Sequence, residues 1–293
     1  MRKNSDLYLM IIPSVILFLV FLYVPMAGLI IAFRKYDIVS GLFGSGWVGF
    51  KNFELFFSDV YFVRILRNTV VLNVWMLLIA FPMPIVLALM INEIRGRRVK
   101  RIFQSVSYLP HFVATVIVVG LMMELLGSRG LVNQVISSLG MKKILFFQDA
   151  SWFRSLYVGS SVWEGTGWRS ILYVSALGSI NPSLYESADI DGATRFQKIR
   201  FITIRGIMPT IVILFILAIG NMMSVGFEKV FLMYSPSTYE TGDVINTYVY
   251  RRGIIGMDYS YSTAVGLFNS IVNFVLLIGA NTLSRKVGDT SLW

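Results

Sequence analysis

The chain contains no cysteine and only one histidine, His111. Without cysteine it cannot form a disulfide, a zinc–thiolate site or a thiol nucleophile. A single histidine with no carboxylate near it in the sequence makes a poor metal site, and no second histidine is available to activate a serine. We therefore expect no metal site and no catalytic residues, and we expect His111 to be packed or interfacial.

Charged residues are also scarce. Of the 293 residues, 14% are charged and 56% are hydrophobic, whereas about a quarter of a soluble domain is charged. A chain this apolar is expected to be surrounded by membrane lipid. The net charge of +10 could suggest nucleic acid, but the basic residues lie between apolar runs and not along one stripe. We therefore expect membrane lipid, and no nucleic acid, as a partner.

Six segments are long and apolar enough to cross a bilayer, which takes about 20 residues. The first run is too long for a secretory signal core and has no small-residue cleavage site after it, so it is expected to be retained as a span. The predicted fold is therefore an all-α integral membrane protein with six transmembrane helices. The expected spans are 7–33, 68–91, 110–126, 153–177, 207–227 and 263–284.

The placement of basic residues predicts the orientation, because short cytoplasmic connections are enriched in lysine and arginine. Such residues are dense at both ends of the chain and in the connections after the second and fourth spans, so both termini are expected in the cytoplasm. They are Arg2, Lys3, Arg95, Arg97, Arg98, Lys100, Arg101, Arg195, Lys198, Arg200, Arg205, Arg285 and Lys286. The expected domains are the first helix with its outside loop (1–67), a domain of five helices (68–284) and a cytoplasmic tail (285–293).

Nucleotide-binding motifs give no support for a bound cofactor. Residues 44–49 match G-x-G-x-x-G, but they lie in an outside loop, without the strand and helix that a dinucleotide site needs, so we interpret them as a turn. No G-x-x-x-x-G-K-[ST] motif is present, so the chain is not expected to bind ATP through a P-loop.

The polar segment 181–205, between spans four and five, is the most informative part of the chain. Asn181 and Pro182 are typical of a helix start, and residues 183–186 fit a capping box. Gly192 is expected to end this helix in a left-handed conformation, and a second helix is expected to follow over 193–202. Glu186 could be no more than a carboxylate at a helix N-terminus.

The spacing of Glu186-Ser187-Ala188, Gly192 and Ile202-x-Ile204 resembles the "EAA" loop of type I ABC importer permeases of the maltose-permease type. Two positions depart from that pattern: Ser187 replaces an alanine, and Arg205 replaces a proline. Further segments resemble the subgroup that imports oligosaccharides derived from polysaccharides. They are 163–168, 177–186, 226–230, 243–251 and 292–293.

The resemblance implies a non-catalytic permease subunit of a bacterial cytoplasmic membrane importer. Its partners would be a second homologous permease, two ATPase subunits, an extracytoplasmic solute-binding protein and an oligosaccharide. ATP and magnesium would be bound by the ATPase subunits and not by this chain. The 186–204 loop would form a cytoplasmic coupling helix that docks on an ATPase subunit. The positions that match the family's coupling residues are Glu186, Ser187, Ala188, Asp191, Gly192, Ala193 and Phe196.

Two charges, Glu164 and Arg169, fall within the fourth span, where charge is costly and usually marks a pathway or an ion pair. Five residues apart, they lie about 140° apart around a helix and need not pair with each other. Arg169 suggests an acidic substrate, and amides and aromatic rings nearby suit a sugar. The full set of candidate pathway residues is Trp163, Glu164, Trp168, Arg169, Tyr173, Asn221, Asn269 and Asn273.

Other interpretations remain open at this point. The charges could form a structural pair with a partner subunit, and the amides could serve helix packing. A stand-alone secondary transporter or channel would show repeated halves or ion-coupling carboxylates, and we detect neither. An intramembrane enzyme would need a paired acid and base or a metal cluster within the spans.

Overall fold

The computed structural model describes residues 5–287 and 291–293 and divides into two compact units. Unit 1 comprises Met1–Val63 and Tyr248–Ile271, and unit 2 comprises Arg64–Thr247 and Val272–Trp293. We describe each unit by itself. The basic residues Arg2 and Lys3, which contribute to the predicted orientation, lie outside the described residues.

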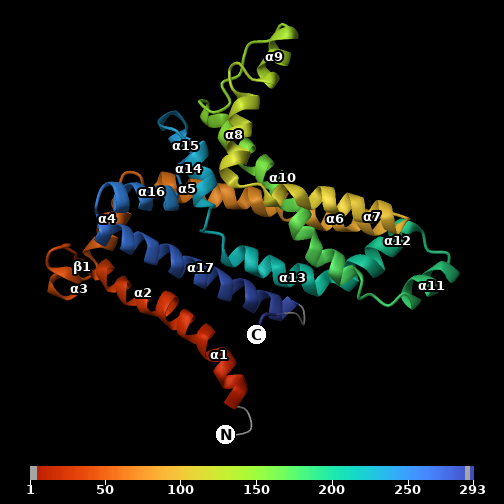
Figure 1. Cartoon of the computed structure of the whole chain (residues 1–293), viewed down its shortest axis with the longest axis horizontal. Coiled ribbons are helices and arrows are strands. Elements are labelled where there is room, and N and C mark those ends of the chain that lie inside the picture. Colours follow the sequence, from red (N-terminus) through yellow and green to blue (C-terminus); the bar gives the residue numbers. More distant parts are fainter. Residues whose placement is uncertain (1–4, 288–290) are drawn as a thin grey trace. The chain divides into compact units, whose positions relative to one another are not determined.

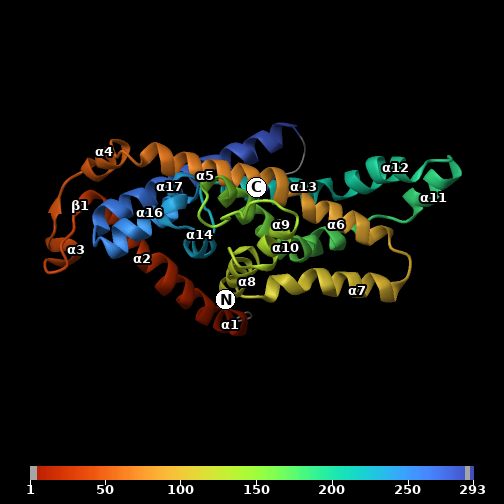
Figure 2. The same ribbon diagram turned by 90° about the horizontal axis from the view of Figure 1, so that it is seen from above.

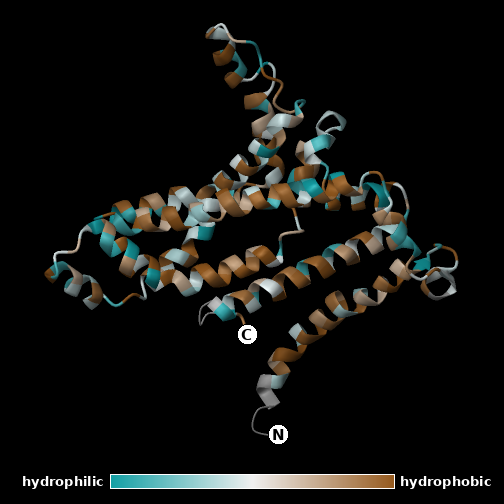
Figure 3. Cartoon of the chain, turned by 180° about the vertical axis from the view of Figure 1, so that it is seen from behind, coloured by the Kyte–Doolittle hydropathy of each residue, from teal (hydrophilic) through white to brown (hydrophobic). Residues whose placement is uncertain are grey.

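Unit 1 begins with the first predicted span, which forms one helical run. This run consists of α1 (Ser5–Phe18), a π-helical turn (Leu19–Tyr23), α2 (Val24–Met26) and a 3-10 segment (Ala27–Phe33). Its side chains from Tyr8 onward are almost uniformly hydrophobic and mostly exposed, as a lipid-facing helix requires (Figure 3).

The rest of unit 1 is built from short elements and the start of the last helix. A two-residue antiparallel pairing, with Arg34 opposite Trp47, is a small departure from the all-α prediction. The elements are β1 (Arg34–Lys35), α3 (Gly41–Gly44), β2 (Gly46–Trp47), α4 (Lys51–Phe57), a π-helical turn (Arg251–Ile255) and the first half of α17 (Tyr259–Val287).

Unit 2 holds most of the remaining helices (Figure 1). They are α5 (Phe62–Trp75), α6 (Pro82–Glu93), α7 (Arg97–Tyr108), α8 (Thr115–Leu126), α9 (Leu131–Ser138), α10 (Ala150–Leu177), α11 (Ser183–Ile190), α12 (Arg195–Lys198), α13 (Ile204–Gly220), α14 (Phe227–Met233), α15 (Tyr239–Gly242) and α16 (Ile245–Tyr250), whose residues from Tyr248 onward belong to unit 1. Short π-helical turns (Met76–Ala80 and Ile199–Thr203) and 3-10 turns (Leu109–Phe112 and Pro236–Thr238) join some of them.

Five of the six predicted spans coincide with helices that are long and apolar enough to cross a membrane. These are Tyr8–Phe33, Phe62–Glu93, Thr115–Ser138, Arg195–Gly220 and Tyr259–Lys286. The predicted fourth span forms α10, a continuous helix of 28 residues that is not among the five. Length is not the reason, because α10 is among the longest helices described. Its charged, serine and glycine residues make it too polar to qualify by composition.

Helix α10 is the core of unit 2. Near its N-terminal end, Phe153, Tyr157 and Val158 pack with Leu72 of α5 and Val230 of α14. Near its C-terminal end, Tyr173 and Leu177 pack with Ala88 of α6 and Ile207 of α13. A polar helix is therefore surrounded by apolar neighbours along its length, which is how a charged span can be kept away from lipid.

Helix α7 approaches the backbone of α10 closely at Gly167. A Cβ built on Gly167 would lie 1.8 Å from the carbonyl oxygen of Ser107, so only glycine fits at this position. Gly159, two turns earlier in the same helix, has nothing within 4 Å of the equivalent position. The two glycines therefore lie in the same helix, but a neighbouring backbone packs closely against Gly167 and not against Gly159.

We expect Gly167→Ala to destabilise the protein by about 1–3 kcal/mol or more, because α7 must move away from α10. Gly159→Ala is the matched control and should change stability by less than about 1 kcal/mol. Thermal unfolding of the two purified variants in detergent measures the difference. Equal midpoints for both variants would contradict the close approach.

In unit 1, the carboxylate of Asp59 joins the loop after α4 to the start of α17. Asp59 accepts hydrogen bonds from the hydroxyls of Tyr248 and Tyr261, and from the backbone amide of Tyr61 at 2.8 Å. Burial raises the pKa of Asp59, but these donors together outweigh burial and hold that pKa below its usual value. Burial and the carboxylate raise the pKa of Tyr248 to about 12, so its phenol stays protonated as a donor.

Because the folded-state pKa of Asp59 is lowered, its contribution to stability is complete above the unfolded value of 3.8 and is lost as the pH falls through the folded value. We expect Tyr248→Phe to remove one donor and so to move this acid loss to higher pH. Asp59→Asn should remove the acid-dependent contribution altogether. Unfolding midpoints between pH 5 and pH 2.5 check this, and identical acid profiles for wild type and both variants would refute it.

Candidate functional site

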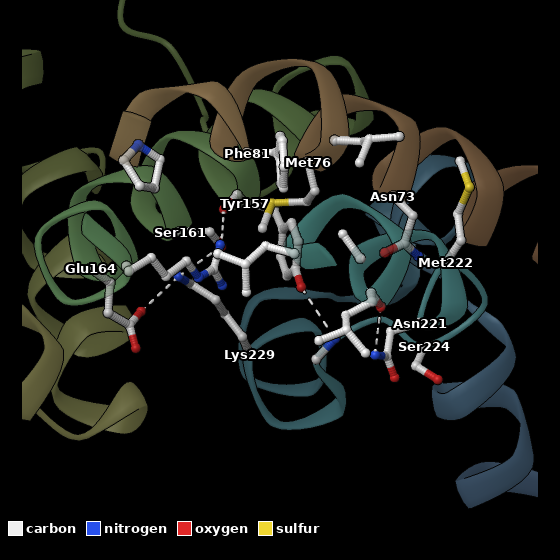
Figure 4. Close-up of a pocket in the computed structure, with 18 of the residues that line it drawn as sticks. Asn73, Met76, Phe81, Tyr157, Ser161, Glu164, Asn221, Met222, Ser224 and Lys229 are labelled. Atoms are coloured by element: carbon white, nitrogen blue, oxygen red, sulfur yellow. Dashed lines mark hydrogen bonds and ion pairs between the residues drawn. The ribbon is translucent and has the colours of Figure 1, made fainter. Parts of the chain in front are cut away.

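Unit 2 contains a cavity of about 710 Å³ beside the middle of α10 (Figure 4). Its wall is formed by side chains of α5 and α6, α10, α13 and α14. Apolar and aromatic side chains line most of it, and a few charged and amide groups face into it. A volume of this size suits a ligand of several hundred daltons.

Arg169 supplies the unpaired positive charge of this cavity. Its side chain is exposed, and among the described residues it makes no ion pair with a carboxylate. The guanidinium lies back along the helix over Gly165, where an added Cβ would be 3.3 Å from Cζ. The missing side chain at Gly165 therefore leaves room for this conformation. A guanidinium held in this way can bind a carboxylate in bidentate fashion.

The second cation of the cavity is Lys229 of α14, and it is paired. Its Nζ donates to Glu164 Oε2 at 2.9 Å and to Ser161 Oγ at 3.1 Å, both on α10 (Figure 4). Lys229 is buried, with 7% of its surface exposed. Burial lowers the pKa of Lys229, and the Glu164 carboxylate opposes that effect by favouring the charged form.

Amide and hydroxyl groups complete the polar lining. Asn221 uses one amide hydrogen on the Leu217 carbonyl at 2.9 Å, and Asn73 uses one on the Thr69 carbonyl at 2.9 Å. Each amide keeps further hydrogen-bonding capacity toward the cavity. The Tyr157 hydroxyl accepts a hydrogen bond from the Gly226 amide at 3.2 Å. Amides, aromatic faces and a free cation together suit a ligand rich in hydroxyl groups that also carries negative charge.

The structure brings half of the predicted pathway residues together. Glu164, Arg169, Tyr173 and Asn221 all line the cavity. The other four candidates, Trp163, Trp168, Asn269 and Asn273, are not among its lining residues.

The four remaining candidates have neighbours other than the cavity. Trp163 is exposed, and Trp168 stacks on His111 at 4.6 Å between ring centroids. The Asn273 carbonyl accepts from the Met223 amide, and its amide donates to Ser224 Oγ. Asn269 is buried, and its Oδ1 has no hydrogen-bond partner among the described residues. His111 is exposed, stacks on Trp168 and also lines the cavity.

Lys229 is the charged residue of the cavity that sequence reasoning missed. It stands in a connection that looked like an outside loop, and its partner is 65 positions away in the chain. The α10 residues that line the cavity, at positions 157, 161, 164, 165, 169, 172 and 173, spread over about half of the helix circumference. That arc leaves out Trp163 but includes Trp168, so helical spacing alone would not have selected the lining residues.

The second candidate site is the turn between α11 and α12, which we call the elbow (residues 183–198). Gly192 has a φ of +71°, the left-handed conformation predicted from the sequence. Thr194 then starts α12 with a capping box, because its Oγ1 accepts from the Gln197 amide and the Gln197 side chain accepts from the Thr194 amide. The elbow forms one extremity of unit 2 in both views (Figures 1 and 2).

The first turn of α11 differs from its predicted capping. No capping box forms over residues 183–186, and Glu186 is exposed. Instead the Asn181 side chain accepts a hydrogen bond from the Ser183 amide at 3.0 Å. The Asn181 carboxamide therefore occupies the position that the predicted box would have used, and Glu186 is left facing solvent.

Contacts inside the elbow hold its two helices together. Lys198 of α12 pairs with Asp189 of α11 at 2.5 Å, and the Tyr185 hydroxyl of α11 lies 3.0 Å from Thr203 Oγ1 in the turn that follows the elbow. Its two most exposed large apolar side chains are Ile190, 88% exposed, and Phe196, 71% exposed. An element that keeps such side chains exposed is typical of a surface that another protein covers.

The predicted coupling positions all lie on this elbow. Ala188 and Ala193 are partly buried, and the others are exposed, namely Glu186, Ser187, Asp191, Gly192 and Phe196. Ile190 was not among the predicted positions, although it is the most exposed apolar side chain of the elbow.

Comparisons with known proteins agree on one family. Residues 80–289 match the family model described as "Binding-protein-dependent transport system inner membrane component". The chain is 43% identical over 292 residues to the polygalacturonan/rhamnogalacturonan transport system permease protein YteP of Bacillus subtilis (strain 168), covering 99% of this chain and 91% of that protein.

Two crystal structures are also similar. One is a bacterial alginate ABC transporter in complex with alginate pentasaccharide-bound periplasmic protein (TM-score 0.91, 43% identity, 99% of this chain and 98% of that chain). The other is a bacterial ABC transporter involved in the import of the acidic polysaccharide alginate (TM-score 0.90, 44% identity, 98% and 97%). The match covers well over half of the chain, and the chain therefore belongs to the family of binding-protein-dependent transport system inner membrane components.

Proposed function

We propose that this chain is the permease subunit of an ATP-driven importer and that it carries an oligosaccharide delivered by an extracytoplasmic binding protein. The observation that carries this proposal is the elbow, a rigid polar turn with exposed Ile190 and Phe196 at one end of a membrane bundle. A stand-alone transporter or channel, the alternative left open by the sequence, has no use for such a surface.

The transmembrane arrangement we propose has six spans, with α10 as the fourth. The polar composition of α10 excludes it from the apolar helices, but an ionisable residue is tolerated in a span when it faces a cavity or a partner. Arg169 and Glu164 face the cavity. With α10 counted, the elbow and both termini lie on the same side, which the density of basic residues assigns to the cytoplasm.

We also propose that the chain divides into three parts: a first helix with its outside loop (1–67), a domain of five helices (68–284) and a cytoplasmic tail (285–293). The elbow is the coupling helix between the fourth and fifth spans. A second homologous permease would complete the membrane part.

The mechanism we propose separates energy supply from transport. ATP and magnesium would be bound by two partner ATPase subunits, and this chain would bind neither. When the ATPase subunits close, each would move a docked elbow, and helices α10 and α13 on either side of it would move with it. Transport of this kind needs two packings of the bundle that are close in free energy. Nucleotide and the loaded binding protein can then shift the equilibrium between these two packings.

The substrate we propose is acidic. Arg169 lines the cavity as an exposed guanidinium without a carboxylate partner among the described residues. A substrate carboxylate would gain charge-assisted hydrogen bonds there. The alginate importer that resembles this chain carries an acidic polysaccharide, which supports the same class of substrate for this chain.

We expect Gly192→Pro to uncouple the elbow. Proline fixes φ near −65° and cannot adopt the observed +71°. Gly41→Pro is the matched control, because Gly41 has a φ of +68°, nothing within 4 Å, and an amide bonded to Asp37 much as the Gly192 amide is bonded to Asp189.

Co-purification of the ATPase subunits from membranes measures docking. Gly192→Pro should lower ATPase recovery by about tenfold, as the loss of one interface's central contacts does, while the amount of chain in the membrane stays near that of wild type. Gly41→Pro should retain the ATPase. Equal recovery with both variants would contradict a role of the elbow in docking.

A further inference from the structure

We propose that Lys229 is a second recognition cation for an acidic substrate, and that Glu164 occupies it until a substrate carboxylate takes its place. In this exchange no covalent bond forms or breaks. One carboxylate leaves the ammonium group as another arrives. This inference rests on the proposed function, because it concerns the substrate of the same cavity.

The geometry makes Glu164 a good stand-in for a substrate group. It contributes a carboxylate oxygen 2.9 Å from Lys229 Nζ, inside the same cavity that Arg169 lines. The two cations lie within electrostatic range of each other, since Arg169 lowers the pKa of Lys229. A ligand that carries carboxylates on successive sugar units could therefore meet both cations.

The two partners of the pair differ in their access to water. Lys229 is buried, whereas the Glu164 side chain is one-fifth exposed. A displaced Glu164 can turn toward the water of the cavity, but Lys229 cannot follow it. Ser161 stays bonded to the ammonium group in either state and keeps it in place. The exchange thus leaves each charge with a partner or with solvent.

A neutral sugar cannot make this exchange. It offers hydroxyl groups, and pulling Glu164 away for them would leave a buried ammonium group without a counter-charge, which is strongly unfavourable. The pair therefore discriminates by repulsion of the wrong substrate as well as by attraction of the right one. Glu228, the other carboxylate of the lining, is exposed, so water screens its charge.

The test uses the complete importer, reconstituted in proteoliposomes with its binding protein. Uptake is compared for two oligosaccharides of equal length: an acidic one, and the same one with its carboxyl groups reduced to alcohols. The measured quantity is the ratio of acidic to neutral uptake. Binding of each sugar to the binding protein is measured separately, so that the two uptake rates are compared at equal occupancy of the binding protein.

We expect Glu164→Gln to raise this ratio by about tenfold, mainly through faster acidic uptake, because a substrate carboxylate no longer has to displace Glu164 and supplies the missing counter-charge of the lysine. Lys229→Gln should lower acidic uptake by about the same factor. In the double variant, which restores a neutral pair of similar size, neutral uptake should match or exceed that of wild type while acidic uptake stays low. This recovery guards against misfolding as the explanation of the single variants.

The control is Asp258→Asn, which breaks the ion pair with Arg252 away from the cavity lining and should leave the ratio unchanged. If the variants at Glu164 and Lys229 slow both sugars equally, the pair is only a structural link between α10 and α14, and the inference is overturned. If the wild-type importer takes up neither sugar in the presence of ATP, the proposed function fails as well. The two failures are thus distinguishable.

Discussion

The constraint on which the structure of unit 2 depends is the polarity of α10. A helix that carries Glu164 and Arg169 near its middle cannot face lipid without a cost of about 2.5–3.5 kcal/mol for each charge. It is therefore enclosed by apolar side chains of α5, α6, α13 and α14, and α7 approaches its backbone at Gly167. The charges that remain are either paired, as Glu164 is with Lys229, or open to the cavity, as Arg169 is.

This same helix connects the two candidate sites. Its middle lines the cavity, and its C-terminal end at Leu177 leads through a short segment to the elbow. The helix is continuous over 28 residues. Under the proposed mechanism, a displacement at the elbow would move this packed helix as a body and so reach the residues that would contact a substrate. The small internal contacts of the elbow, such as Lys198 with Asp189, keep it from absorbing that displacement.

Local sequence signals predicted local structure well. The apolar runs marked five helices, and the position of Gly192 marked the turn, because only a glycine accepts its φ without strain. Family resemblance pointed to the elbow, and the comparisons show the family. The prediction of a capping box at 183–186 was wrong, because the Asn181 side chain accepts the hydrogen bond of the Ser183 backbone amide.

The composition of the cavity could be predicted only in part. Glu164 and Arg169 were found because charge is rare in a span. Lys229 was not, because its burial depends on how α14 packs against α10, and no pattern within residues 226–230 reports that. Tertiary packing between distant segments is what the sequence left open.

The absence of cysteine makes the central claim directly testable, because a single introduced cysteine is a unique label on this chain. The measurement is the rate at which a membrane-impermeant thiol reagent modifies Asn221→Cys, which lies in the cavity, from the cytoplasmic side of the assembled importer. We predict rapid modification without nucleotide and strong protection when the ATPase subunits are trapped closed with ATP and vanadate. An unchanged rate in the trapped state would show that closure at the elbow does not reach the cavity, and would contradict the account.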